Sequence, residues 1–195
     1  LASFKQLKPV LGILAIVVIL FSAKSFTRNF VWKDNFTLFT TDAATSPNSA
    51  KVRNSAGGEL IAQSIKPENG LKKVAMLNEA IVHLKEAARI HPGFKNAYLL
   101  LGNAHNYLEK YEEAITYYNQ ALTLDPDYAE ANNNLGITYR DAGRFYGEKQ
   151  GNTQKAIEYL NKAFEIRPDE YETARLLGVA YGISQNNPKA IENEY

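Results

Sequence analysis

Four prolines at near-regular intervals constrain the fold of this 195-residue chain more than any other feature. Each is followed ten residues later by a glycine, which gives the pairs Pro47 and Gly57, Pro92 and Gly102, Pro126 and Gly136, and Pro168 and Gly178. The middle interval between prolines is 34 residues, and its neighbours are 45 and 42 residues. Because the pattern persists on both sides of each longer interval, we expect the additional residues in loops or helix extensions. The chain is therefore an array of one repeated unit.

Small residues also recur at fixed distances from the prolines. Twelve and five residues before each of the last three prolines stand alanines: Ala80, Ala87, Ala114, Ala121, Ala156 and Ala163. Two helices pack closely only where one of them lacks bulk, so the glycines and alanines mark the expected crossing points of helix pairs. Proline cannot continue a helix, so each proline is expected to follow the second helix of its unit. The pattern predicts an all-α protein.

This pattern resembles the tetratricopeptide repeat family, most clearly in "PGFKNAYLLLGNAHNYLEKYEEAITYYNQALTLDP". The resemblance covers residues 47–195 and implies a solenoid of about three and a half helix-turn-helix repeats. We place the repeats at 47–91, 92–125, 126–167 and 168–195, the last one partial. The first repeat departs most from the pattern, since Ala56 stands where a leucine is expected.

Before the repeats, the 14 residues from Val10 to Ala23 carry no charge. A membrane-spanning helix needs about 20 residues, and Lys5, Lys8 and Lys24 can extend toward lipid headgroups so that a longer segment crosses. We therefore predict a transmembrane helix at residues 1–27. Two alternatives remain open. The first is a signal peptide, although Phe21 stands at a position where the cleavage site requires a small residue. The second is a buried core helix, although a solenoid has no central core to receive one. Basic residues flank both ends, so the positive-inside rule gives no orientation.

The segment 28–46, which joins the apolar run to the repeats, is rich in aromatic residues. Trp32, Phe36 and Phe39 have the i, i+4, i+7 spacing of one helix face, which predicts a helix from Trp32 to Thr45. Phe39 lies eight residues before Pro47, as in the second helix of each repeat, so this is a half repeat. We place Phe30, Trp32 and Phe36 at the membrane interface, which aromatic rings favour. A helix that only caps the array is the alternative.

The junction of apolar run, "TRNFVWKDNFTLF" and "SPNSAK" resembles the transmembrane-and-tetratricopeptide-containing protein O-mannosyltransferases and their bacterial relatives. The resemblance implies the noncatalytic C-terminal region of a membrane protein glycosyltransferase, with its repeats in the periplasm or the endoplasmic reticulum lumen. The catalytic acidic residues of that family lie in a loop with no counterpart here, so we predict no catalytic residue. The alternatives are a stand-alone membrane-anchored scaffold for envelope protein assembly and an exported soluble adaptor.

Composition excludes several other functions. The chain has 22 basic and 21 acidic residues and a net charge of +1, which provides no basic stripe for nucleic acid. It has no cysteine, and its three histidines, His83, His91 and His105, are dispersed. His105 occupies a position held by tyrosines in later repeats, so we interpret it as a core residue. We expect no metal site and no cofactor.

The remaining candidate site is a groove. In the family that the repeats resemble, the first helix of each pair lines a concave surface that binds protein or extended peptide. The matching residues are Lys51, Asn54, Asn96, Leu99, Asn103, Asn106, Glu130, Asn133, Arg140, Glu172 and Arg175, with Ile61, Ile137 and Val179 between them. Asparagine is unfavourable inside helices, but its amide can both donate to and accept from a peptide backbone. A merely solvated groove is the alternative.

The two longer repeats carry their additional residues between the first and second helix, in "IKPENGLKK" and "RDAGRFYGEKQGN". Insertions of this kind collect on one face of a solenoid, so we expect both on the same edge. Phe145 and Tyr146 of the second insertion have two possible roles. They pack within an extended helix pair, or they form with residues 65–73 an edge that contacts a membrane-embedded part or a substrate.

Overall fold

The computed structural model describes residues 4–186, and within this range all regular structure is helical. Two helices precede the repeats: α1 (Phe4–Val31) and α2 (Asn35–Thr45). The repeats comprise α3 (Ala50–Ser64), η1 (Pro67–Lys72), α4 (Lys73–Ile90), α5 (Lys95–Tyr107), α6 (Tyr111–Leu124), α7 (Ala129–Arg144), η2 (Phe145–Lys149), α8 (Thr153–Ile166) and α9 (Tyr171–Asn186). The described part is the all-α solenoid that the sequence predicted.

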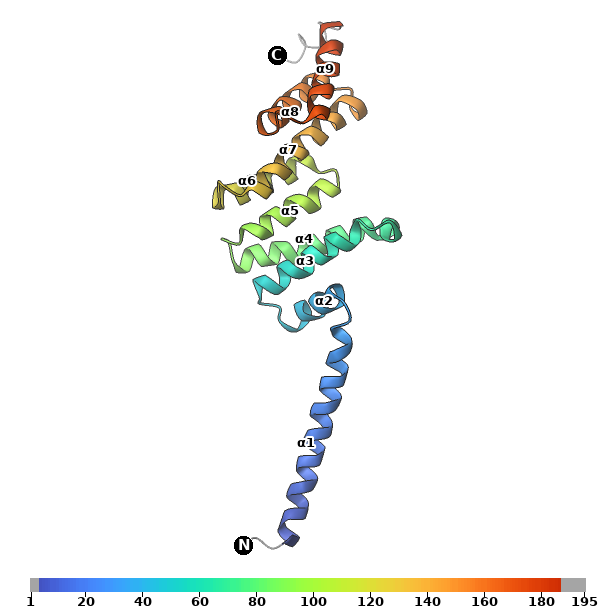
Figure 1. Cartoon of the computed structure of the whole chain (residues 1–195), viewed down its shortest axis with the longest axis vertical. Helices are drawn as coiled ribbons and strands as arrows, with labels where there is room; N and C mark the ends of the chain where they lie inside the picture. Colours follow the sequence, from blue (N-terminus) through green and yellow to red (C-terminus); the bar gives the residue numbers. More distant parts are fainter. Residues whose placement is uncertain (1–3, 187–195) are drawn as a thin grey trace.

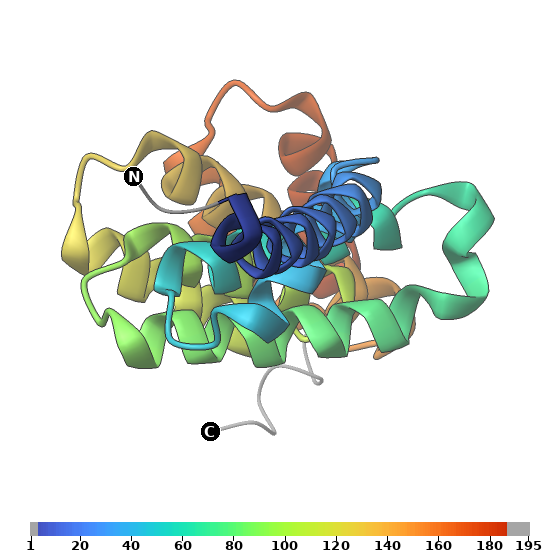
Figure 2. The same cartoon turned by 90° about the horizontal axis from the view of Figure 1, so that it is seen from below.

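Consecutive helices from α3 onward pack as antiparallel pairs that stack along one axis, and α1 projects from the end of the stack (Figure 1). Viewed along that axis, the repeats superpose and α1 runs across them (Figure 2). The turns inside each pair lie on one side of the stack, and the turns between pairs lie on the other side (Figure 1). Both insertions, which contain η1 and η2, are on the first side, as expected.

Small residues mark the crossing points in the first two pairs as predicted. A Cβ added to Gly57 would lie 2.5 Å from Leu84 Cγ, and one added to Gly102 would lie 2.5 Å from Tyr118 Cε1. In the third pair the prediction of Gly136 is wrong. Leu160 packs instead on Gly143, where an added Cβ would lie 2.5 Å from Leu160 Cγ. The insertion lengthens α7, so that α8 crosses it further along.

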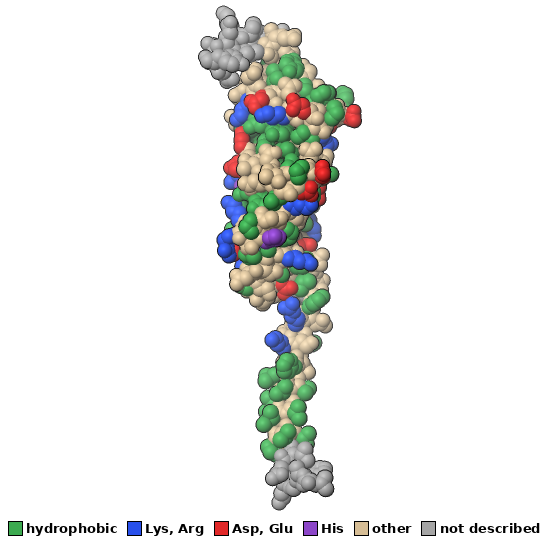
Figure 3. Space-filling view, turned by 90° about the vertical axis from the view of Figure 1, so that its left-hand side faces the viewer, with side chains coloured by type: hydrophobic (Ala, Val, Ile, Leu, Met, Phe, Trp, Pro, Cys, Tyr) green, Lys and Arg blue, Asp and Glu red, His purple; other side chains and the backbone are tan. Residues whose placement is uncertain are grey.

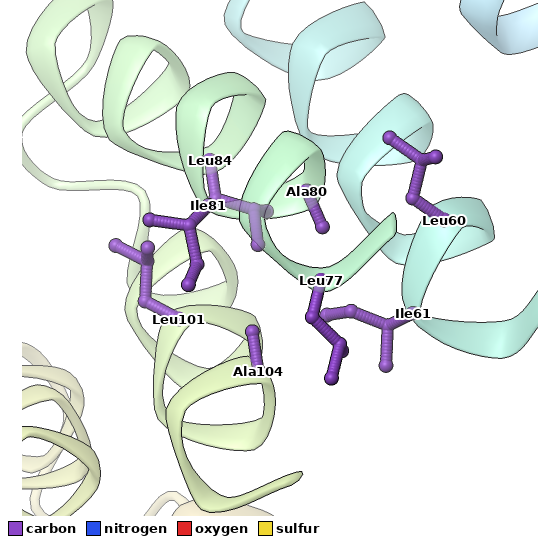
Figure 4. Packing of buried hydrophobic residues seen from close by; sticks show 8 residues of the cluster. All are labelled: Leu60, Ile61, Leu77, Ala80, Ile81, Leu84, Leu101 and Ala104. Atoms are coloured by element: carbon purple, nitrogen blue, oxygen red, sulfur yellow. The ribbon is translucent and has the colours of Figure 1, made fainter. Parts of the chain in front are cut away.

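The hydrophobic core runs continuously between neighbouring pairs. In its first cluster, side chains from α3, α4 and α5 converge: Leu60, Ile61, Leu77, Ala80, Ile81, Leu84, Leu101 and Ala104 (Figure 4). Leu77 and Leu84 are fully buried between the two neighbouring first helices. Burial of one leucine stabilises a fold by about 1.5–3 kcal/mol. Because these leucines contact both first helices, each second helix connects its own pair to the next one.

By contrast, α1 lies outside this core. Its segment Pro9–Asn29 has a mean hydropathy of 2.2, and none of the most apolar window is buried. This helix is long and apolar enough, by length and composition, to cross a membrane. On the face in Figure 3, hydrophobic side chains follow α1, and basic side chains appear where it meets the repeats. Among the described residues α1 is therefore not part of a core, and it continues to Val31, beyond the predicted end at residue 27.

The helix that follows begins later than predicted. Trp32 lies in the turn between α1 and α2 and is exposed. Asp34 is the N-cap of α2 and accepts a hydrogen bond from Thr37 N at 2.7 Å, which fixes the helix start at Asn35. Phe36 packs against the first core cluster, so its ring is shared with the repeats. Phe30 lies in α1, but its side chain is outside the described part of the chain.

Candidate functional site

A polar pocket opens between the neighbouring first helices α5 and α7. Helix α5 contributes Asn103, Asn106 and Tyr107, helix α7 contributes Asn134, Ile137 and Asp141, and Tyr118 of α6 closes the base. The pocket has a volume of about 250 Å³. Two of its residues, Asn103 and Asn106, belong to the predicted groove set, as does Ile137 at its edge.

Hydrogen bonds fix the orientation of one amide in this pocket. Asn103 Oδ1 accepts from the Tyr118 hydroxyl at 2.7 Å and from Asn134 Nδ2 at 2.9 Å. Burial raises the pKa of the Tyr118 hydroxyl, which keeps it protonated as a donor. With both acceptor positions of Asn103 Oδ1 filled, its amide nitrogen remains available as a donor. The pocket therefore presents an oriented N–H group.

A second amide supplies an acceptor. Asn106 Oδ1 is buried and has no hydrogen-bond partner among the described residues. An unpaired buried carbonyl costs on the order of 1–3 kcal/mol, which a bound N–H group would recover. Donor and acceptor thus stand on the same face of α5, separated by three residues and less than one helical turn. This is the pair of functions that a peptide backbone requires.

Other predicted groove residues are engaged in hydrogen bonds within and between repeats. Asn96 Oδ1 accepts from the Tyr128 hydroxyl at 3.2 Å, and Asn133 Oδ1 accepts from Arg167 Nη1 at 2.5 Å. Arg140 Nη1 donates to Glu170 Oε1 at 2.5 Å, and its Nη2 donates to Asp141 at 2.8 Å. The Asn96–Tyr128 and Arg140–Glu170 contacts connect successive repeats, whereas the other two lie within the third repeat.

The remaining members of the predicted set are dispersed. Glu172 pairs with Arg175 on α9 at 2.8 Å, and Lys51 and Glu130 are exposed. Leu99 is 1% exposed in the core around Tyr118, so its assignment to a groove surface is wrong. Asn54 is 8% exposed and is likewise buried. The repeat pattern located the correct helices but did not distinguish the surface from the core on each helix.

The sequence reasoning missed Asn134, Tyr107, Tyr118 and Asp141. Asn134 was detectable, because it stands eight residues after Pro126, where the preceding repeat has Leu100. Leu100 packs against the first core cluster and lies 3.5 Å from the position of a Cβ on Gly58. Replacement of that leucine by a shorter amide leaves space between α5 and α7. The pocket therefore depends on a residue that departs from its counterpart in the previous repeat.

Phe145 and Tyr146 form packing contacts and not a free edge. The Phe145 ring is 5.5 Å from that of Tyr111, and the Tyr146 ring stacks on Tyr159 at 5.5 Å. Both side chains are half-buried, and the Tyr146 hydroxyl donates to Glu112 of the preceding repeat. Burial and the nearby Glu112 carboxylate raise the pKa of Tyr159 to about 12. These contacts favour the first of the two predicted roles, packing within the helix pair, for these two residues.

Metal chemistry finds no support in the described residues, where no group of three or more His, Cys, Asp or Glu side chains converges. His105 is 7% exposed and packs on the Tyr117 ring at 5.2 Å, as expected for a core residue. His83 Nδ1 lies 3.1 Å from Arg53 Nη1 in the first repeat.

Comparison with known proteins identifies the repeats. Residues 102–143 match the family model described as TPR repeat, and residues 141–170 match the model described as tetratricopeptide repeat. The chain is 26% identical to the human protein O-mannosyl-transferase TMTC3, over 60% of this chain and 17% of that protein. It is 27% identical to the Drosophila melanogaster protein O-mannosyl-transferase Tmtc3, over 58% of this chain and 11% of that protein. The chain thus spans less than a fifth of either relative.

Among solved structures, the chain is similar to TTC0263, a thermophilic TPR protein of Thermus thermophilus. The two share 22% sequence identity with a TM-score of 0.48, over 73% of this chain and 69% of the other.

Proposed function

From the premise that the chain carries tetratricopeptide repeats, we propose that it binds an extended polypeptide in the groove between α5 and α7. The observation that carries the proposal is the amide pair: Asn103 offers an N–H group, and the buried Asn106 Oδ1 lacks a partner among the described residues. A peptide backbone provides the complementary C=O and N–H groups at each residue. Recognition of this kind depends weakly on sequence and suits a domain that holds unfolded or flexible segments.

We further propose that α1 crosses a membrane and holds the repeats at its surface. An apolar helix with no buried residues in its most apolar window requires a nonpolar environment. Arg28 near its end pairs with Asp42 of α2 at 3.0 Å, which connects the helix to the repeats. Trp32, exposed in the following turn, is then at the level of the lipid headgroups. The resemblance to the O-mannosyltransferases supports the further proposal that the repeats lie on the extracytoplasmic side.

The similarity to protein O-mannosyl-transferases supports a role for this domain as part of a larger enzyme. We propose that the chain is a noncatalytic part of a membrane protein glycosyltransferase that presents acceptor polypeptides to a catalytic region elsewhere. Purified residues 1–195 are expected to show no sugar transfer. Turnover that copurifies with this chain and is lost through a point mutation in it would contradict that role.

The groove is tested by photo-crosslinking. A benzophenone amino acid replaces Ile137 at the pocket, or Gln120 at an exposed position of α6 as the matched control. The full chain is illuminated with a fluorescent pool of random 11-residue peptides. We expect adducts at position 137 that decrease when Asn106 and Asn134 are replaced by alanine. Equal labelling at positions 137 and 120 would contradict the proposal.

The membrane role is tested separately. A fragment from Asn48 to Tyr195 is expected to be a helical monomer in buffer, whereas the full chain requires detergent or lipid. A full chain that remains monodisperse without detergent, measured by size-exclusion chromatography with light scattering, would contradict a membrane span.

A further inference from the structure

A second pocket repeats the first one along the stack, between α7 and α9. The residues 8, 11 and 15 positions after Pro126 line the first pocket: Asn134, Ile137 and Asp141. The residues at the same distances after Pro168 line the second: Leu176, Val179 and Ile183. The base changes in the same way, since Leu160 takes the place of Tyr118. The two pockets are therefore equivalent positions of one groove.

The chemistry of the two pockets is opposite. Amides and a carboxylate predominate in the first pocket, whereas aliphatic side chains predominate in the second, together with Arg144, Glu148 and Thr153. Val179 is 50% exposed and Ile183 is 52% exposed, although both lie in a concave site. Aliphatic surface in a pocket is favourable only when an apolar group covers it. The second pocket thus has the character of a site for an apolar side chain.

The two pockets adjoin each other through α7. Asp141 borders the first pocket and Arg144 borders the second, and the two side chains pair at 3.5 Å across the ridge between them. The Arg144 side chain remains 49% exposed and offers further N–H donors to a chain that passes over the ridge. A ligand that extends from one pocket to the other can therefore form hydrogen bonds with polar side chains between them.

The residues that follow α9 are expected to pack beside the second pocket and not in it. The sequence "KAIE" occurs at 155–158, near the start of α8, and again at 189–192. It therefore predicts the second helix of the fourth repeat, although those residues lie outside the described range. Second helices pack against the glycine face of their own first helix, which on α9 contains Gly178. Gly178 does not line the pocket, so this helix would leave the pocket open.

We propose that the second pocket is an anchor for one aliphatic side chain of the extended polypeptide that the first pocket holds by its backbone. This inference rests on the proposed function and gives the ligand a chemical class. Neighbouring helices lie about 10 Å apart, and the crossing moves about two turns, or roughly 10 Å, along α7. The pockets are then on the order of 15 Å apart, which an extended chain spans with four or five residues.

The probes are two fluorescein-labelled 11-residue peptides composed of Gly, Ser, Thr and Gln, with either Leu or Ala at one position five residues from the end. Their binding to the full chain in lipid nanodiscs is measured by fluorescence anisotropy, with empty nanodiscs as the control. We expect the Leu peptide to bind about 10- to 100-fold more tightly, as burial of a leucine side chain allows. Ile183→Asp should remove this difference.

Val82→Asp is the matched control, because Val82 is an aliphatic residue of α4, 65% exposed and outside both pockets. It should change neither affinity. Circular dichroism verifies that each variant is folded, and Val179→Asn, which introduces no charge, serves as the second variant. Loss of the Leu preference in both groove variants supports the anchor.

Three results would overturn the inference. Equal affinity for the Leu and Ala peptides, both weakened by Asn134→Ala, would remove the anchor and leave the proposed function intact. Binding of neither peptide would contradict the proposed function as well. A more than tenfold gain in Leu-peptide affinity after removal of residues 187–195 would show that this chain's own continuation fills the pocket.

Discussion

The pairs α5/α6 and α7/α8 are built from the same pattern of residues but cross at different points. Tyr118 packs on Gly102, ten residues after a proline, whereas Leu160 packs on Gly143, seventeen residues after one. Gly136, the residue that the pattern selects, faces Arg167 at the end of α8. Gly136 and Gly143 are seven residues apart, which is nearly two full turns and returns to almost the same helix face. An insertion close to two turns therefore moves the crossing without rotating the helix.

The ring pairs beside each crossing follow the same shift. His105 lies three residues after the crossing glycine, Gly102, and Tyr117 lies one residue before Tyr118. Their ring centroids are 5.2 Å apart. Tyr146 and Tyr159 have the same relation to Gly143 and Leu160, with centroids 5.5 Å apart. The third repeat thus reproduces the packing of the second one at a displaced site. The aromatic residues of the insertion complete that packing.

The largest expected effect comes from a methyl group at either true crossing point. Gly102→Ala and Gly143→Ala each place Cβ about 2.5 Å from a buried side chain of the opposite helix. Such overpacking costs about 2–3 kcal/mol, more than the helix propensity of alanine recovers. Thermal unfolding followed by circular dichroism should show similar losses for the two variants. A neutral Gly143→Ala would contradict the displaced crossing.

The second prediction concerns the insertion that displaces the crossing. Phe145→Ala with Tyr146→Ala removes contacts to Tyr111 and Tyr159 and should lower the free energy of unfolding by about 2 kcal/mol. Peptide binding in the groove should be unchanged. Tyr171→Ala is the control, because Tyr171 is 78% exposed and should unfold like the unaltered chain. A stable double variant with impaired binding would restore the predicted contact edge.

These residues show what sequence patterns can establish. The proline and glycine spacing was sufficient to predict helix pairs, because a proline after a helix and a glycine at a crossing are local requirements. The spacing could not determine which of Gly136 and Gly143 is the crossing point, since both lie on one helix face. That choice depends on where α8 returns, which is a matter of tertiary packing.

The candidate site was less predictable for the same reason. Leu99 and Asn103 both belong to α5 positions that line grooves in the family, yet Leu99 is buried and Asn103 borders a pocket. The pocket itself exists because Asn134 is shorter than its counterpart Leu100. A deviation from the repeat created the site, whereas the repeat pattern describes only what the units share.

The third prediction concerns how the stability of the fold depends on pH through His105, a member of the first ring pair. Burial lowers the pKa of His105, and the nearby Lys110 and Lys85 act in the same direction, against Glu113. Because the folded pKa is below the unfolded value near 6.5, the unfolded state binds a proton first. Stability should therefore be complete above that pH and decrease as the pH falls below it. His105→Tyr, which copies Tyr146 of the next repeat, should reduce this pH dependence in chemical denaturation measured from pH 7.5 to 5. An unchanged profile would contradict a role for His105.

The smallest effect is expected at Gly136, and it provides the most direct test of the comparison. A Cβ there would lie 2.8 Å from Arg167 Cδ and 3.0 Å from Ile166 Cγ2. The nearest atom belongs to a long, flexible side chain that can move, although Arg167 Nη1 would have to keep its bond to Asn133. Alanine also favours the helix over glycine by about 0.5–1 kcal/mol. These opposing terms leave a net change of about 1 kcal/mol or less, so Gly136→Ala should unfold within a few degrees of the unaltered chain. If Gly136→Ala were as damaging as Gly102→Ala, then α8 would cross α7 at the position that the sequence pattern indicates, and the displaced register would be wrong.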